Sequence, residues 1–320
     1  MLHVVNGDSA RMGLERSGIP GTFIVWPDVL YEGPTPLATG EEWIRARAGY
    51  LASLDEAPDR HVIEGYRNND AALEAFREHD EVVFWLEHDL FDQLLLLRHL
   101  WWLQLRTGAA SSPHGLPRLS LVCRDVYLGP LPPEAFPPLF EARQPIAESQ
   151  IAMGSEIWRA FCAADPTRLA RFAAEDDEYA ELPYVKAALV RHLEEFPSID
   201  NGLSRTESQL LRVLLDGPLT FGAAFRASTD LEERMFMGDL SFWAIAKTLA
   251  AAAHPLVAID RAPHGRLMPA ATLRVTDAGR DVLGGRADLI ALNGIDRWLG
   301  GTHLTRAHGY RWDAPEVVAW

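Results

Sequence analysis

The chain has little cysteine and little lysine. Cys123 and Cys162 are its two cysteines among 320 residues, too few for a disulfide scaffold or a structural zinc site and typical of a protein from the reducing cytoplasm. Lys186 and Lys247 are the two lysines, so arginine supplies most of the 30 basic residues, against 45 acidic ones. A formal charge of −15 repels phosphate backbones, which makes a general nucleic-acid coat protein a poor fit.

Long apolar runs are also missing. The most apolar stretch, residues 94–105, contains Arg98 and His99 and is too short to span a bilayer. The N-terminal residues MLHVVNGDSARMG contain no basic leader followed by an apolar core. We therefore expect no signal peptide, no membrane partner and a cytoplasmic location. The length is that of two or three domains.

The first part of the chain alternates between strand and helix patterns. Apolar runs predict buried strands at residues 2–6, 22–26, 81–87 and 118–123. Helical patterns lie between them at residues 41–54, 70–78 and after residue 88, and we expect Ser9 or Asp8 to cap another helix after the first strand. This rhythm predicts an α/β fold, in which residues 1–132 form a mainly parallel, Rossmann-like sheet domain.

The rest of the chain is mainly helical. Residues 133–200 predict a helical region that ends in the linker-like stretch PSIDNGLS. Three helical patterns then precede two strand patterns and a last helix, which is the order of a winged helix, and Ser204 with Glu207 forms a capping box at its start. We predict a winged-helix-like domain over residues 201–320, with an aromatic tail from Asp296 that shows no clear period.

The charges of the winged-helix-like segment argue against DNA as its partner. Residues 201–288 contain 10 acidic and 10 basic residues, and the predicted recognition helix, residues 239–250, carries one of each. A DNA reader needs several Arg or Lys residues on this helix and on the wing. Basic side chains do cluster where the wing would lie, at Arg261, His264, Arg266 and Arg274. A protein partner for this domain is nevertheless the stronger expectation.

Polar and acidic residues follow each predicted strand. Because ligands bind beyond the carboxyl ends of parallel strands, this edge of the sheet is the predicted site. We predict His88 and Glu87 as catalytic acid–base residues, and Asp8 and Asp89 as ligands of Mg²⁺ or Mn²⁺, since these ions prefer carboxylate oxygens. No histidine pair here has zinc spacing. The predicted ligand-binding residues are Asn6, Gly7, Ser9, Asp28, Glu32, Asp92, Gln93 and Arg124.

Structural roles compete with these functional ones. Asp89 is well placed as the N-cap of the following helix, with Asp92 in its first turn, where acids offset the helix dipole. His88 and Asp92 are four residues apart, so a neighbouring carboxylate would raise the pKa of the histidine. The turn from Asn6 to Ser9 either presents N–H groups to a phosphate or is only a tight turn. Arg124 either neutralises the acids or holds an anionic ligand.

Several motifs resemble a known bacterial family. HVVNGDS, VWPDVLYEGP and WLEHDLFDQ are similar to motifs of the proteins catalogued as domain of unknown function 1835. RHLEEFPSIDNGLSRTE and GDLSFW resemble the helical C-terminal domain that accompanies it. The resemblance covers nearly the whole chain and implies an intracellular bacterial protein built in two parts. It implies no activity.

Two functions fit these observations. The sequence favours an enzyme that acts on a small phosphorylated or nucleotide-like ligand in an acidic strand-end cleft, using a divalent cation. The alternative is a regulatory or adaptor protein, whose α/β domain senses a ligand and whose winged-helix-like domain contacts a protein in preference to DNA. The two functions differ in whether the strand-end residues carry out chemistry.

Overall fold

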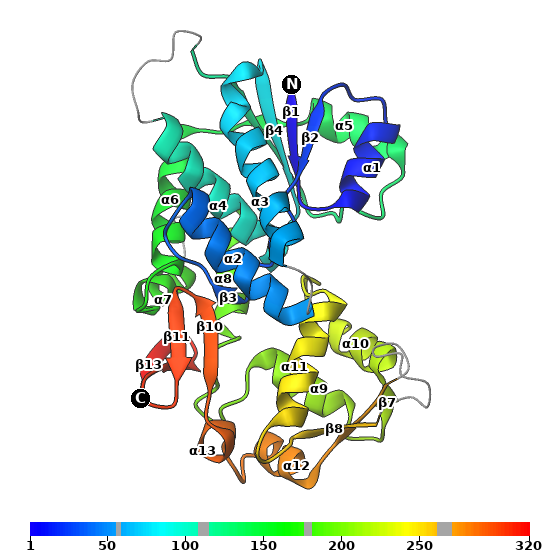
Figure 1. Cartoon of the computed structure of the whole chain (residues 1–320), viewed down its shortest axis with the longest axis vertical. Coiled ribbons are helices and arrows are strands. Elements are labelled where there is room, and N and C mark those ends of the chain that lie inside the picture. Colours follow the sequence, from blue (N-terminus) through cyan, green and yellow to red (C-terminus); the bar gives the residue numbers. More distant parts are fainter. Residues whose placement is uncertain (56–58, 108–114, 176–180, 261–270) are drawn as a thin grey trace.

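The protein has an α/β fold. A computed structural model describes residues 1–55, 59–107, 115–175, 181–260 and 271–320, and these ranges contain thirteen α-helices (Figure 1). The four strands predicted in the first part of the chain are confirmed, each ending within one residue of its predicted end. The main sheet consists of β1 (Leu2–Val5), β2 (Thr22–Val25), β4 (Glu81–Leu86), β5 (Arg118–Cys123) and β6 (Gln144–Pro145).

This sheet is parallel except at one edge. Its order is β2-β1-β4-β5-β6, in which β1 is parallel to β2 and β4, β4 is parallel to β5, and β6 is antiparallel. Val5 lies opposite both Val25 and Trp85, so the three strands end nearly level. The chain passes from β1 to β2 on one side and later returns to β4 on the other. A reversal of this kind leaves a crevice at the strand ends, here between β1 and β4.

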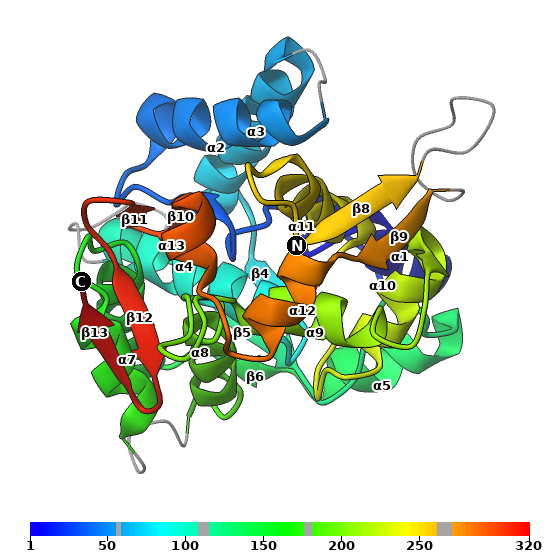
Figure 2. The same ribbon diagram turned by 90° about the horizontal axis from the view of Figure 1, so that it is seen from below.

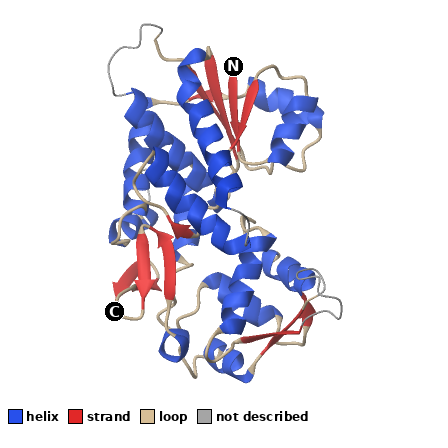
Figure 3. Ribbon diagram, in the orientation of Figure 1, coloured by secondary structure: helices blue, strands red, loops and turns tan. Residues whose placement is uncertain are grey.

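Helices cover both faces of the sheet (Figures 1 and 3). One face packs on α1 (Asp8–Arg16) and α5 (Phe136–Glu141), through side chains that include Leu14, Trp85 and Phe136. All residues of β1 and β4 are buried, as the near-continuous apolar sequences of these strands require. The other face belongs to a larger core with α2 (Gly40–Asp55), α3 (Asp59–Glu74), α4 (Leu90–Thr107), α6 (Glu148–Phe161), α7 (Thr167–Ala174) and α8 (Val185–Leu193).

Helix α4 lies in the middle of this helical layer and is buried along most of its length. Its Arg98 guanidinium lies over the rings of Trp26 and Trp43, 4.1 and 4.7 Å from their centroids. Gly154 of α6 allows a close approach, because a Cβ at this position would lie 2.8 Å from Cβ of Leu100 on α4. Within the described residues, no helix combines the length and the apolar character that a membrane span requires.

Residues 203–289 build a second core of their own. Ser204 and Glu207 form the predicted capping box at the start of the first helix of this part. Arg261, His264 and Arg266, predicted for a wing, lie outside the described residues. The elements are α9 (Arg205–Val213), β7 (Leu219–Thr220), α10 (Phe221–Thr229), α11 (Asp239–Ala251), β8 (Val257–Asp260), β9 (Thr272–Val275) and α12 (Asp277–Leu283).

The last residues return to the N-terminal part of the molecule (Figure 2). After α13 (Leu289–Asn293), β10 (Asp296–Gly300) and β11 (Thr302–Thr305) form a hairpin, and β10 also pairs in parallel with β3 (Gly33–Pro34). A second hairpin joins β12 (Tyr310–Asp313) to β13 (Glu316–Ala319). Leu299 and Leu304 belong to the larger core. No period in the sequence predicted these strands, because they are short and largely polar.

Two local predictions are wrong. Neither Ser9 nor Asp8 caps the first helix, since α1 begins at Asp8 and its N-cap is Gly7, with no side-chain cap. The helix predicted at residues 70–78 starts earlier, because α3 begins at Asp59 and a 3₁₀ turn covers Ala75–Glu78. The domain boundaries at residues 132 and 200 stay predictions.

The contact between α4 and α6 predicts an unusual response to alanine. Alanine forms helix more readily than glycine by about 1 kcal/mol, yet Gly154→Ala places a methyl group against Leu100. We expect a net loss of about 1–3 kcal/mol in the free energy of unfolding, measured by urea denaturation. Gly65→Ala in α3, where nothing lies within 4 Å of the added Cβ, should stabilise instead. Equal effects of the two substitutions would contradict the close packing.

Candidate functional site

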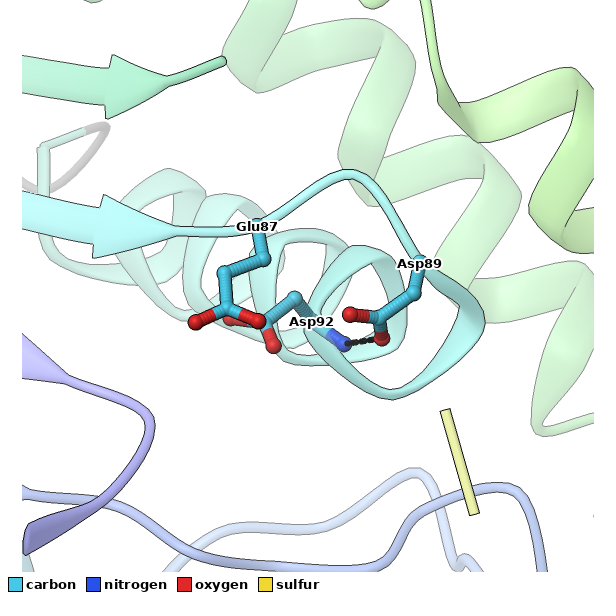
Figure 4. A group of neighbouring side chains, drawn as sticks. All are labelled: Glu87, Asp89 and Asp92. Carbon is cyan, nitrogen blue, oxygen red and sulfur yellow. Dashed lines mark hydrogen bonds between the residues drawn. The ribbon is translucent and has the colours of Figure 1, made fainter. Parts of the chain in front are cut away.

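Three acidic side chains meet at the carboxyl end of β4 (Figure 4). Glu87 follows the strand, Asp89 lies in the turn before α4, and Asp92 lies in the first turn of that helix. One oxygen of each carboxyl group lies within 4.8 Å of the others, and all three residues are buried. The structure therefore brings together three of the residues that the sequence placed at the strand ends.

Each of the three carboxyl groups is held by a different hydrogen bond. The Asn6 amide, just after β1, donates to Oδ2 of Asp92 at 2.9 Å, and the Leu128 N–H, from the loop after β5, donates to Oε1 of Glu87 at 2.7 Å. The Asp92 N–H donates to Oδ1 of Asp89 at 3.2 Å, so Asp89 is indeed the N-cap of α4. The cluster consequently lies at the reversal of strand order. Oδ1 of Asp92 is buried without a hydrogen-bond partner.

The three carboxyl groups resist ionisation. Burial raises the pKa of Asp89 to about 7. Burial also raises the pKa of Asp92 well above its usual range, and the charges of Asp89 and Glu87 add to this shift. The pKa of Glu87 is raised by burial, against the opposing effect of the Leu128 N–H. Groups this close bind protons or a cation in order to relieve their repulsion.

Gln93 supports the turn beside the carboxyl groups. Its amide donates to the Glu87 carbonyl at 2.6 Å and contacts Sγ of Cys123 at 3.4 Å. Burial raises the pKa of the Cys123 thiol to about 12, so this sulfur stays protonated at neutral pH. The group of neighbouring ligand atoms consists of carboxylate oxygens from Glu87, Asp89 and Asp92 and does not include this sulfur.

His88 has a different carboxylate partner from the predicted one. Its Nε2 lies 3.1 Å from Oδ1 of Asp125, which follows β5, and the structure shows no hydrogen bond between His88 and Asp92. The pKa of His88 is lowered from its ordinary value, because burial outweighs the attraction of Asp125. The ring packs between Tyr127 and Tyr184, at centroid distances of 4.9 and 5.9 Å. Nδ1 of His88 is buried without a partner.

Four predicted residues near the strand ends do not reach the carboxyl cluster. The Asp8 side chain is 72 % exposed and lies 3.0 Å from Arg11, which leaves it poorly placed to share a metal with Asp89. Gly7 and Ser9 belong to the start of α1, and Ser9 is exposed. Arg124 is also exposed, and its Nη2 points to the Ala142 carbonyl, 3.5 Å away. Glu87 and Asp92 take the position that the sequence assigned to Asp8.

Asp28 forms a buried ion pair with Arg47 of α2. The two side chains are fully buried and lie 2.8 Å apart. The Arg47 guanidinium also donates to the carbonyls of Val29, Glu32 and Pro34. This arginine therefore fixes the loop after β2, and a buried pair of this kind destabilises the fold strongly when one partner is lost. Oδ1 of Asp28 accepts both hydrogen bonds from Arg47, and its Oδ2 is buried without a hydrogen-bond partner.

Glu32 lies in the contact between the loop after β2 and α11. The Ser241 hydroxyl is 2.8 Å from Oε1 of Glu32 and 3.0 Å from the Tyr31 hydroxyl. With Tyr50 and Arg297, Glu32 lines a cavity of about 280 Å³ that does not include the carboxyl cluster. Burial raises the pKa of Glu32 to about 7.

Sequence reasoning missed several residues around His88. Asp125 had a signal, since it also follows a predicted strand, but Arg124 beside it was favoured. Tyr127, Tyr184 and Arg234 had no signal, because their positions depend on contacts between distant segments. Tyr127 donates to the Met235 carbonyl at 3.0 Å, and the Arg234 guanidinium lies 5.5 Å from the centroid of the Tyr184 ring. These contacts bring residues 234–235 next to His88.

No family model matches the chain, and no curated protein matches it either. The likeness to domain of unknown function 1835 therefore stays a prediction.

The position of Glu32 predicts a pH-dependent stability. Because its folded pKa is about 7 and its ordinary value is 4.5, the folded state binds more protons than the unfolded state between these pH values, and stability falls as the pH rises through this window. Glu32→Gln removes the penalty. We expect the variant to gain free energy of unfolding relative to the wild type. This gain, measured by urea denaturation, should be about 1–3 kcal/mol larger at pH 8 than at pH 5.

Glu42→Gln is the matched control, because Glu42 is exposed on α2. This variant should follow the wild type at both pH values. A Glu32→Gln variant with the same advantage at pH 5 and pH 8 would show that Glu32 does not titrate in this window.

Proposed function

We propose that the protein is an enzyme that binds Mg²⁺ or Mn²⁺ at Glu87, Asp89 and Asp92 and acts on a small phosphorylated or nucleotide-like ligand. The observation that carries the proposal is the meeting of three buried carboxyl groups within 4.8 Å, with one oxygen of Asp92 left without a partner. The cluster lies at the strand-order reversal, where α/β sheets bind their ligands.

The chemistry of the cluster favours a hard divalent cation. Carboxylate oxygens without nitrogen or thiolate ligands suit Mg²⁺ and Mn²⁺ better than Zn²⁺. A cation replaces the protons that the raised pKa values of Asp89 and Asp92 otherwise favour. Asn6 orients Asp92 and Leu128 orients Glu87, so the oxygens are held before any ion binds. A bound cation would polarise a phosphoryl or carbonyl oxygen of the substrate.

His88 is the proposed acid–base group. Asp125 accepts the proton on Nε2, which leaves the lone pair on Nδ1 of the neutral ring. That atom is buried and has no hydrogen-bond partner, while other atoms of His88 line a cavity of about 520 Å³. A neutral imidazole oriented by a carboxylate acts as a general base when a hydroxyl group or a water molecule reaches its free nitrogen. Asp125 is a positioning residue for this step.

The C-terminal part supports the enzyme more than the adaptor. Helices α9, α10 and α11 followed by β8 and β9 are consistent with the winged-helix-like order. Phe242 and Trp243 of α11 are buried, and Ser241 contacts Tyr31 and Glu32 of the N-terminal part. The start of α11, the helix that would read DNA or bind a partner, is thus already covered by the N-terminal part. Glu232, Glu233 and Arg234 of this part line the cavity beside His88, and we infer that the C-terminal part contributes to the site through them.

The cation is tested by a neutral substitution in the cluster. Asp92→Asn keeps the shape of the side chain and replaces a buried carboxyl group that resists ionisation, so the variant should fold. In the wild type, Mn²⁺ at about 100 times its Kd should add about 2.7 kcal/mol to the free energy of unfolding, seen as a rise of several degrees in Tm. Asp92→Asn should lose most of this rise, because a coordinating carboxylate is gone.

Asp216→Asn, an exposed substitution on the C-terminal part, should keep the full effect of Mn²⁺. The proposal is wrong if Mn²⁺ and Mg²⁺ leave the wild-type Tm unchanged, or if Asp92→Asn responds to Mn²⁺ like the wild type.

A further inference from the structure

The cavity beside His88 is walled by distant parts of the chain. Its volume is about 520 Å³, within the range of sites for small ligands. One wall comes from His88 and Leu90 at the start of α4, a second from α8, and a third from residues 232–234 between α10 and α11. His88, which stands between Glu87 and Asp89 in the chain, belongs to this lining, and the three clustered carboxyl residues do not.

The glutamates of this cavity pair with arginines of the same walls. Arg191 donates to Glu232 at 2.7 Å and to Glu195 at 2.7 Å. Arg205 donates to Glu194 at 2.8 Å and to Glu233 at 2.6 Å. Apart from Arg234, the described lining carries three acidic side chains and three basic ones, the third basic one being Lys186. The pairs also fix residues 232–233, which precede Arg234.

Arg234 has no carboxylate partner among the described residues. Its guanidinium lies over the ring of Tyr184, which also contacts the ring of His88. The side chain is half-buried. A half-buried guanidinium without a counter-charge is costly, and its planar donors match a phosphate or a carboxylate. The geometry therefore offers a cationic donor set at the wall of an otherwise charge-balanced cavity.

A phosphate suits Arg234 better than a simple carboxylate does. A phosphate monoester carries a charge of about −1.5 to −2 at pH 7 and three acceptor oxygens, whereas a carboxylate carries one charge on two oxygens. Nδ1 of His88 is fully buried and is not exposed to the cavity, so Arg234 provides the recognition.

We propose that this cavity binds the phosphate group of a small phosphate monoester, with Arg234 as the residue that recognises the phosphate. The inference rests on the proposed function, because it takes the phosphorylated ligand of that proposal as the occupant. Tyr127 connects His88 with the segment that carries Arg234: its ring packs on His88, and its hydroxyl donates to the carbonyl of Met235, the residue after Arg234. A ligand in the cavity would thus lie between Arg234 and the acid–base group.

The test is calorimetric titration without divalent cations, so that it does not depend on the metal site. The probes are ribose 5-phosphate, inorganic phosphate and acetate, with wild type, Arg234→Ala, Arg234→Gln and Arg234→Lys. We expect ribose 5-phosphate to bind the wild type more tightly than phosphate, and acetate to bind least. Arg234→Ala and Arg234→Gln should weaken the binding of ribose 5-phosphate at least tenfold. Arg234→Lys should lose less of this affinity, because lysine keeps the charge but not the planar fork.

Arg212→Ala is the matched control, since Arg212 is an exposed arginine of α9. It should bind ribose 5-phosphate like the wild type, and Arg234→Ala should keep the wild-type rise of Tm with Mn²⁺. If the wild type binds no phosphate probe, or if both neutral Arg234 variants bind it unchanged, the phosphate site is wrong while the metal site stands. If Mn²⁺ does not raise the Tm of the wild type but ribose 5-phosphate still binds, the metal site is wrong and the phosphate site stands.

Discussion

The repulsion among three buried carboxyl groups is the constraint on which the site depends. At 4.8 Å and an effective dielectric constant of about 20, two unit charges repel by roughly 3 kcal/mol. The fold does not let these groups separate. Asn6 holds Asp92 from the end of β1, Leu128 holds Glu87 from the loop after β5, and Asp89 caps α4. A rigid arrangement of like charges is stable only with protons or a cation among them, and this makes the strand end reactive.

The sequence predicted the sheet well because its strands are buried on both faces. Full burial requires near-continuous apolar segments, and β1 and β4 show them clearly. The parallel order then places Asn6, Glu87 and Asp89 at one edge. The position of a residue after a strand does not determine where its side chain lies or what it contacts, however. Asp28 comes three residues after β2 and turns to Arg47, and Asp8 lies on the exposed side of α1.

The residues around His88 were harder to predict for a different reason. Asp125 and Tyr127 come from the loop after β5, Tyr184 precedes α8, and Arg234 precedes α11. The contacts of His88 with Asp125, Tyr127 and Tyr184 join loops that are far apart in the sequence, and those of Arg234 and Met235 depend on how the second core packs on the first. No local pattern records such packing. The same holds for the tail, where β10 pairs with β3 although each is too short and too polar to be recognised alone. Local sequence thus indicates the edge of the sheet that carries the candidate site, while tertiary packing determines which side chains surround it.

The pairing of β3 with β10 also bears on how the molecule is made. Gly33 lies opposite Leu299, so the strand that pairs with β3 is synthesised long after β3 itself. Until β10 has been synthesised, the loop that contains Tyr31 and Glu32 lacks its neighbouring strand, even if the parallel sheet has already formed. A nascent chain that has not reached β10 would therefore carry a parallel sheet whose neighbouring loop is unpaired.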